Sequence, residues 1–90
     1  MKGLTEIQEL YNNICSRYNA LSVKAYFVSD KDLSYKGLYV EVPFRKIYLN
    51  TNCFNDRTIY HEIFHHLNPK LNDGDEFEIL LTEFIKKETK

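Results

Sequence analysis

The chain has 90 residues, of which 43% are hydrophobic, and a formal net charge of −1 at pH 7. This length is enough for a single domain over residues 1–90 with one modest core, and it leaves no room for a separate substrate-binding domain. The near-neutral charge argues against a nucleic-acid-binding protein, because neutralising phosphates requires a basic surface.

The first element in chain order is an amphipathic helix over residues 4–19, because apolar residues recur there at three- and four-residue spacing. Thr5 and Gln8 form a capping-box pattern at its start. The β-branched and aromatic residues of Leu21–Val28 then predict a strand. Asp30–Asp32 predicts a turn, followed by a loose polar stretch.

Two more strands and two helices follow. The alternation of apolar and polar residues predicts a half-buried strand at Gly37–Val42, and a short third strand follows at Lys46–Leu49. Helical spacing of apolar residues predicts a helix at 56–68, stopped by Pro69, and a last helix at 74–88. The order helix, three strands, helix, helix predicts an α+β domain with a small antiparallel or mixed sheet.

The membrane and secretion signals are missing from the sequence. No apolar run approaches the roughly 20 residues that span a bilayer, and the first residues lack the apolar segment of a signal peptide. Cys15 and Cys53 do not form a Cys-x-x-Cys pair, which is typical of free thiols in an intracellular protein. We therefore expect a cytoplasmic protein without a membrane partner.

The predicted helix at 56–68 contains the pattern His61-Glu62-x-x-His65. Residues four apart lie on one helical face, so the two imidazoles can bind one ion, and zinc accepts such ligands. Glu62 lies about 100° around the helix, where its carboxylate can take a proton from a water at the metal. Asn55 or Asp56 stands at the N-cap position. The pattern predicts a catalytic zinc helix, although other divalent ions suit the same ligands.

A third protein ligand is needed, because catalytic zinc takes three and leaves one position open for water. The last helix offers four carboxylates, namely Asp75, Glu76, Glu78 and Glu83. Glu78 is favoured because it borders the apolar face of that helix and would need a partner if buried. Glu76 and Glu83 are the next alternatives. The apolar face consists of Phe77, Leu80, Leu81, Phe84 and Ile85.

The third histidine of the chain, His66, follows His65 directly and points about 100° away from it. Its place near the end of the helix favours an exposed or capping role, with a role beside the substrate as the alternative. Together with Tyr48 and Tyr60, it is a candidate for stabilising an oxyanion.

The segments Ile47–Asn50 and Arg57–Leu67, followed by Glu76-Phe77-Glu78-Ile79, resemble the ImmA/IrrE-type metallopeptidases and the minimal gluzincins called minigluzincins. The resemblance covers about residues 38–85, and its specific part is the His61-Glu62-x-x-His65 motif. Phe64 stands where these families have a glycine.

The resemblance implies a zincin-like domain in which His61, His65 and Glu78 bind zinc and Glu62 is the general base. It also implies that an edge strand binds an extended peptide by backbone pairing. The positions concerned are Leu38, Tyr39, Val40, Glu41 and Val42, with His66 beside them. The expected function is a small zinc metalloendopeptidase acting on a peptide or protein. The alternatives are a latent member of the fold and a binding module that opposes a repressor.

Overall fold

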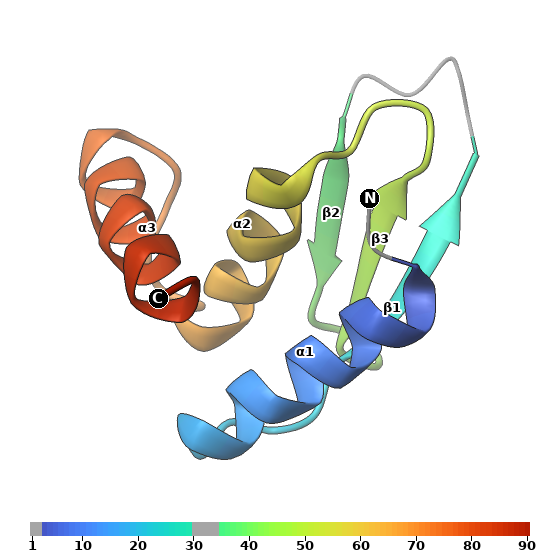
Figure 1. Ribbon diagram of the computed structural model, residues 1–90, viewed down its shortest axis with the longest axis horizontal. Helices are drawn as coiled ribbons and strands as arrows, with labels where there is room; N and C mark the ends of the chain where they lie inside the picture. Colours follow the sequence, from blue (N-terminus) through green and yellow to red (C-terminus); the bar gives the residue numbers. More distant parts are fainter. Residues whose placement is uncertain (1–2, 30–34) are drawn as a thin grey trace.

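The computed structural model describes residues 3–29 and 35–90, and within them it contains three helices and one three-stranded sheet (Figure 1). This confirms the predicted α+β class and element order. The predicted turn at Asp30–Asp32 lies outside the described residues. The elements are α1 (Leu4–Arg17), β1 (Lys24–Val28), β2 (Gly37–Val40), β3 (Lys46–Asn50), α2 (Asp56–Leu67) and α3 (Asp75–Glu88).

The sheet is mixed, with the strand order β1-β3-β2. β3 lies in the centre, parallel to β1 and antiparallel to β2. Ile47 of β3 is opposite Ala25 on one side and Tyr39 on the other. β2 is therefore an edge strand, as the resemblance implies.

Two predicted strand boundaries were wrong. β1 begins at Lys24 and not at Leu21, and β2 ends at Val40 and not at Val42. Pro43 has no backbone N–H and restricts the residue before it, which disfavours a continued strand there.

The predicted capping box at the start of α1 is also wrong. The N-cap is Gly3, which makes no side-chain cap. Gln8 turns instead to the sheet, where its Oε1 accepts from the Ala25 backbone N–H at 2.8 Å and its Nε2 donates to the Val23 carbonyl at 3.0 Å. Gln8 thus joins α1 to β1. These long-range bonds replace the local one that the sequence pattern predicted.

The helices form two layers on the sheet. α1 packs on β1, α2 packs on β2 and β3, and α3 packs against α2 farther from the sheet (Figure 1). The Tyr11 hydroxyl of α1 donates to the Ile59 carbonyl of α2 at 2.8 Å, inside the core. The fully buried side chains that form the centre of the core include Ile7, Tyr11, Ile14, Ile47, Leu49, Ile63, Phe77 and Leu81.

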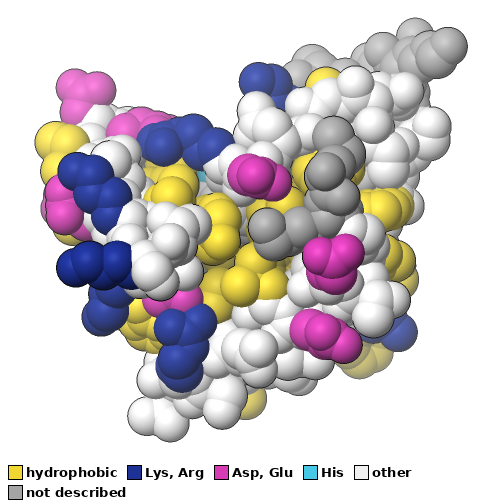
Figure 2. Space-filling view, in the orientation of Figure 1, with side chains coloured by type: hydrophobic (Ala, Val, Ile, Leu, Met, Phe, Trp, Pro, Cys, Tyr) yellow, Lys and Arg dark blue, Asp and Glu magenta, His cyan; other side chains and the backbone are white. Residues whose placement is uncertain are grey.

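An aromatic cluster holds α3 in place. Phe64 of α2 packs on Phe77 and Phe84 of α3, with ring centroids 5.3 and 5.0 Å apart. Leu80, predicted on the buried face, is 42% exposed. Arg17 and Glu88 form an ion pair that ties the end of α1 to the end of α3. In Figure 2 the Lys and Arg side chains gather around α3, and hydrophobic side chains line the hollow between α3 and α1.

Among residues 3–29 and 35–90, no helix is both long and apolar enough to cross a bilayer.

Candidate metal centre

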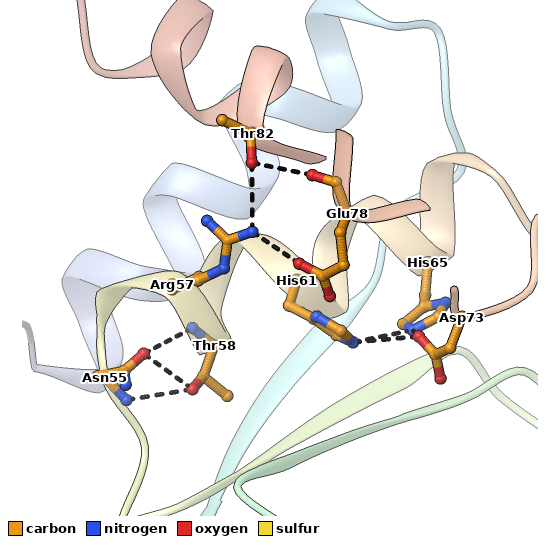
Figure 3. Close-up of polar contacts among 8 residues, drawn as sticks. All are labelled: Asn55, Arg57, Thr58, His61, His65, Asp73, Glu78 and Thr82. Carbon is orange, nitrogen blue, oxygen red and sulfur yellow. Dashed lines mark hydrogen bonds and ion pairs between the residues drawn. The ribbon is translucent and has the colours of Figure 1, made fainter. Parts of the chain in front are cut away.

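Three side chains converge between α2 and the loop that follows it (Figure 3). His61 and His65 stand one helical turn apart, with their Nε2 atoms 3.1 Å from each other. Asp73 Oδ1 lies 3.5 Å from Nε2 of His61 and 3.1 Å from Nε2 of His65. Two imidazole nitrogens and one carboxylate oxygen thus point to a common centre.

The spacing of these three atoms fits a metal ion. In a tetrahedral site with ligands roughly 2.0–2.1 Å from the ion, ligand atoms are about 3.3–3.4 Å apart. The three separations here are 3.1, 3.1 and 3.5 Å. The His61, His65 and Asp73 group could therefore hold a metal ion.

The helix α2 presents the two histidines because its sequence fixes both its start and its buried side. The Asn55 side chain accepts from the Thr58 backbone N–H, and the Thr58 side chain accepts from the Asn55 backbone N–H, which forms a capping box. Ile59 and Ile63 are buried. The opposite side of the helix then carries His61 out of the core, as the sequence predicts.

Asp73 lies in the loop between α2 and α3, directly before Gly74, where the chain turns into α3. Gly74 has φ 152° and ψ −171°, a region that is essentially limited to glycine. The last helix, predicted over 74–88, begins at Asp75 with Gly74 as its N-cap, and Asp73 is the residue directly before that glycine. The residue that completes the group was missed by the sequence argument, which considered only the carboxylates of α3.

The imidazoles sit in a partly desolvated environment. The pKa of His61 is lowered chiefly by burial and then by the neighbouring His65, while Asp73 acts in the opposite direction. Neutral imidazole is the form that binds metals. The centre therefore favours the protonation state of His61 that a metal ion requires.

The carboxyl group of Glu62 is buried next to the histidines, with 6% of the residue exposed. Burial raises its pKa from 4.5 to about 7, the charge of Asp73 adds to the rise, and a backbone hydrogen bond from Tyr39 opposes it. Gly37 of β2 permits this close packing, because a Cβ there would lie 2.9 Å from both Glu62 Cγ and Thr58 Cγ2.

Glu78, the favoured third ligand, lies outside the converging group in this structure. Its Oε2 accepts from Arg57 Nη2 at 2.7 Å, and the same nitrogen lies 3.3 Å from Thr82 Oγ1 (Figure 3). About half of each side chain of the pair is exposed. Glu78 is near enough to His61 to raise the pKa of that histidine slightly, against the effect of burial. Its role as a ligand stays a prediction, as do those of Glu76 and Glu83.

The expected exposed or capping role of His66 was wrong, because the side chain is buried and its partners lie outside α2. His66 is 7% exposed. Its Nε2 donates to the Leu21 carbonyl at 2.6 Å, and its Nδ1 accepts from the Tyr39 hydroxyl at 3.0 Å. Because the carbonyl can only accept, the ring is the neutral Nε2–H tautomer, and burial lowers its pKa. His66 therefore joins α2 to β2 and to the segment before β1.

Two recesses meet at His61 and Glu62. The metal-side recess has a volume of about 240 Å³ and is lined by Gly37, Leu38, Tyr39, His61, Glu62, His65 and Asp73. The basic recess has a volume of about 410 Å³ and is lined by Lys36, Gly37, Asn55, Arg57, Thr58, His61 and Glu62.

The predicted peptide-binding positions divide into two groups. Leu38 and Tyr39 line the metal-side recess, whereas Val40, Glu41 and Val42 line neither recess. Glu41 and Val42 follow the end of β2, so they do not extend the edge strand. The part of the predicted surface that faces the metal centre is Leu38 and Tyr39 of β2.

The candidate oxyanion donors point elsewhere. Tyr48 stacks on Tyr26 of the neighbouring strand with ring centroids 5.5 Å apart, and Tyr60 packs on Phe84 of α3. Like His66, both lie outside the residues that line the two recesses.

No protein-family profile, curated protein sequence or solved structure matches this chain. The geometry of the candidate metal centre and the chemistry of its residues are therefore the evidence for a function.

Proposed function

We propose that the protein is a small zinc-dependent metallopeptidase. His61, His65 and Asp73 would hold the ion, and Glu62 would act as the general base. The observation that carries the proposal is the convergence of two Nε2 atoms and one carboxylate oxygen within 3.1–3.5 Å of one another, beside a buried carboxyl group. Two imidazoles and one carboxylate are a ligand set typical of catalytic zinc.

The chemistry of the ion and that of the protein can be separated. Bound zinc would supply a Lewis acid that polarises a carbonyl and acidifies water. Glu62 would accept the proton of the attacking water and return it to the leaving amine. Its raised pKa in the ion-free protein reflects burial, and a nearby cation would lower that pKa again.

The edge of β2 supports binding of an extended peptide. Leu38 and Tyr39 line the metal-side recess, so a chain paired with this edge would pass next to Glu62. Backbone pairing to an edge strand gives affinity with little demand on sequence. Side chains of the substrate would then enter the metal-side recess and the adjoining basic recess, which meet at His61 and Glu62.

The proposal is tested by metal analysis and peptide cleavage on the same preparations. The protein, purified without chelators, is expected to contain one zinc ion per chain and to cleave unfolded casein. The His61→Ala variant should lose both the metal and the cleavage. Glu62→Gln should keep the metal and lose cleavage by a factor of about 10² or more, typical of removing a general base.

Two results would overturn the proposal. A Glu62→Gln protein that cleaves as well as the wild type would remove the mechanism. Stoichiometric metal binding without cleavage of any substrate would favour the alternative of a binding module with this fold.

A further inference from the structure

The two recesses that meet at Glu62 differ in charge. The metal-side recess contains Asp73, whereas the basic recess contains the cationic side chains of Lys36 and Arg57. Both recesses share Gly37, so they adjoin each other at the start of β2. A peptide that runs along this edge would meet a cationic surface on one side of the metal centre.

Arg57 forms an ion pair with Glu78 of α3 and leaves part of its donor capacity unused. Its contacts with Glu78 Oε2 and Thr82 Oγ1 both involve Nη2. Nη1 and Nε make no hydrogen bond to any residue within 3–29 and 35–90. Glu78 thus orients the guanidinium from the side of α3 and leaves other donors for an anion.

Lys36, the residue directly before β2, adds a second positive charge to the lining of the basic recess. Its backbone carbonyl accepts from the Asn50 N–H at 2.9 Å, which fixes the main chain there. Within the described parts of the chain, the Lys36 ammonium forms no ion pair. The basic recess therefore combines the ammonium of Lys36 with the guanidinium of Arg57, which keeps free donors beside its ion pair with Glu78.

We infer that the basic recess binds the carboxylate of an aspartate or glutamate side chain, so that the protein selects peptides with an acidic residue within about two positions of the cleaved bond on one side. A strand advances about 3.3 Å per residue, which limits the distance from the metal centre to these positions. This inference rests on the proposed peptidase function. It assigns the substrate specificity to Lys36 and Arg57.

The first experiment measures cleavage. Short alanine-based peptides carry one Glu, Gln or Lys, which is moved through the positions on both sides of the cleaved bond. The Glu peptide should be cleaved with a kcat/KM about 10–100-fold higher than its Gln counterpart at one position, as a charged hydrogen bond predicts. The preference should shrink at high ionic strength.

Variants connect the preference to the basic recess. Lys36→Glu should abolish the preference for Glu over Gln and favour the Lys peptide, and Arg57→Gln should reduce the Glu/Gln ratio about tenfold. Lys24→Gln is the matched control, because it removes one charge from β1 at the other edge of the sheet. Its Glu/Gln ratio should equal that of the wild type.

A binding experiment separates this inference from the proposed function. The same peptides are titrated into ¹⁵N-labelled Glu62→Gln protein, and the shift of the Arg57 Nε–H resonance is followed by NMR. Tighter binding of the Glu peptide, lost with an added Lys36→Glu change, supports the inference even if no peptide is cleaved. Equal binding of the Glu and Gln peptides overturns it, even if the protein is an active peptidase.

Discussion

The ring of Phe77 lies nearly parallel to the imidazole of His65, with centroids 4.4 Å apart and an interplanar angle of 24°. The same ring is 4.9 Å from the imidazole of His61. Phe77 is completely buried on α3. One aromatic side chain therefore supports both histidines of the metal centre, and α3 contributes to the centre by packing.

Phe77→Leu tests this support. Leucine keeps the site apolar but removes the flat surface, so we expect both imidazoles to become more mobile. Losing a group that orients metal ligands typically weakens metal affinity about 10–100-fold. Competition with a chromophoric chelator measures this change. Phe84→Leu is the control, because Phe84 packs in the same cluster against Phe64 and Tyr60. Equal zinc affinity of Phe77→Leu and wild type would contradict the role of the ring.

The third ligand can be assigned by comparing Asp73→Asn with Glu78→Gln. Asp73 Oδ1 lies 3.1 Å from His65 Nε2, whereas Glu78 is engaged with Arg57. We expect Asp73→Asn to weaken zinc binding at least about tenfold, since even supporting residues have effects of this size. Glu78→Gln should change affinity much less. Elemental analysis and chelator competition measure both. The opposite result would show that Glu78 leaves Arg57 to bind the ion, as the resemblance implies.

The close approach of β2 to α2 depends on a single glycine. A Cβ at Gly37 would lie 2.9 Å from Glu62 Cγ and Thr58 Cγ2, closer than side-chain carbons pack. Gly37→Ala should therefore lower the free energy of unfolding by about 1–3 kcal/mol, as overpacking does. Urea denaturation measures this. Gly3→Ala is the control for overpacking, because nothing lies within 4 Å of its Cβ position and its effect is limited to the N-cap of α1. A Gly37→Ala protein of unchanged stability would show that the two elements separate at little cost.

The sequence predicted α2 and the histidine pair well because several local signals agree there. The Asn55 cap, the apolar spacing and Pro69 place the helix to within one residue of its observed range, Asp56–Leu67. The motif spacing then fixes which face carries His61 and His65, whatever the rest of the fold does.

Asp73 could not be ranked in the same way because it lies in the loop between α2 and α3. A helical wheel compares residues within one helix and says nothing about a loop residue that lies against the preceding helix. The usable signal was distance along the chain, because only seven loop residues, 68–74, join α2 to α3. A carboxylate in so short a connection stays near the end of α2.

The burial of His66 is also determined by tertiary contacts. The helical angle correctly turned it away from His65, but burial depends on Tyr39 and Leu21, which are 27 and 45 residues away in the chain. The same reasoning applies to Gln8, whose partners lie 15 and 17 residues along the chain. Local patterns predicted a helix cap for Gln8 and an exposed ring for His66. In the structure both side chains form long-range hydrogen bonds instead.

The buried carboxyl group of Glu62 predicts a pH-dependent stability in the metal-free protein. Its pKa is raised from 4.5 to about 7 in the folded state. Between these values the unfolded chain binds fewer protons than the folded chain, so the free energy of unfolding falls as pH rises. The full loss of unfolding free energy is on the order of 3 kcal/mol and is complete above about pH 7.

The Glu62→Gln variant tests this, because its side chain has no carboxyl group to titrate. In EDTA, the variant should match the wild type near pH 4 and be more stable near pH 8 by up to that amount, as measured by urea denaturation. A wild type at least as stable as Glu62→Gln at both pH values would mean that the carboxylate is not desolvated. Added zinc should reduce the difference in unfolding free energy between Glu62→Gln and the wild type at about pH 8, because a cation beside Glu62 favours the ionised form.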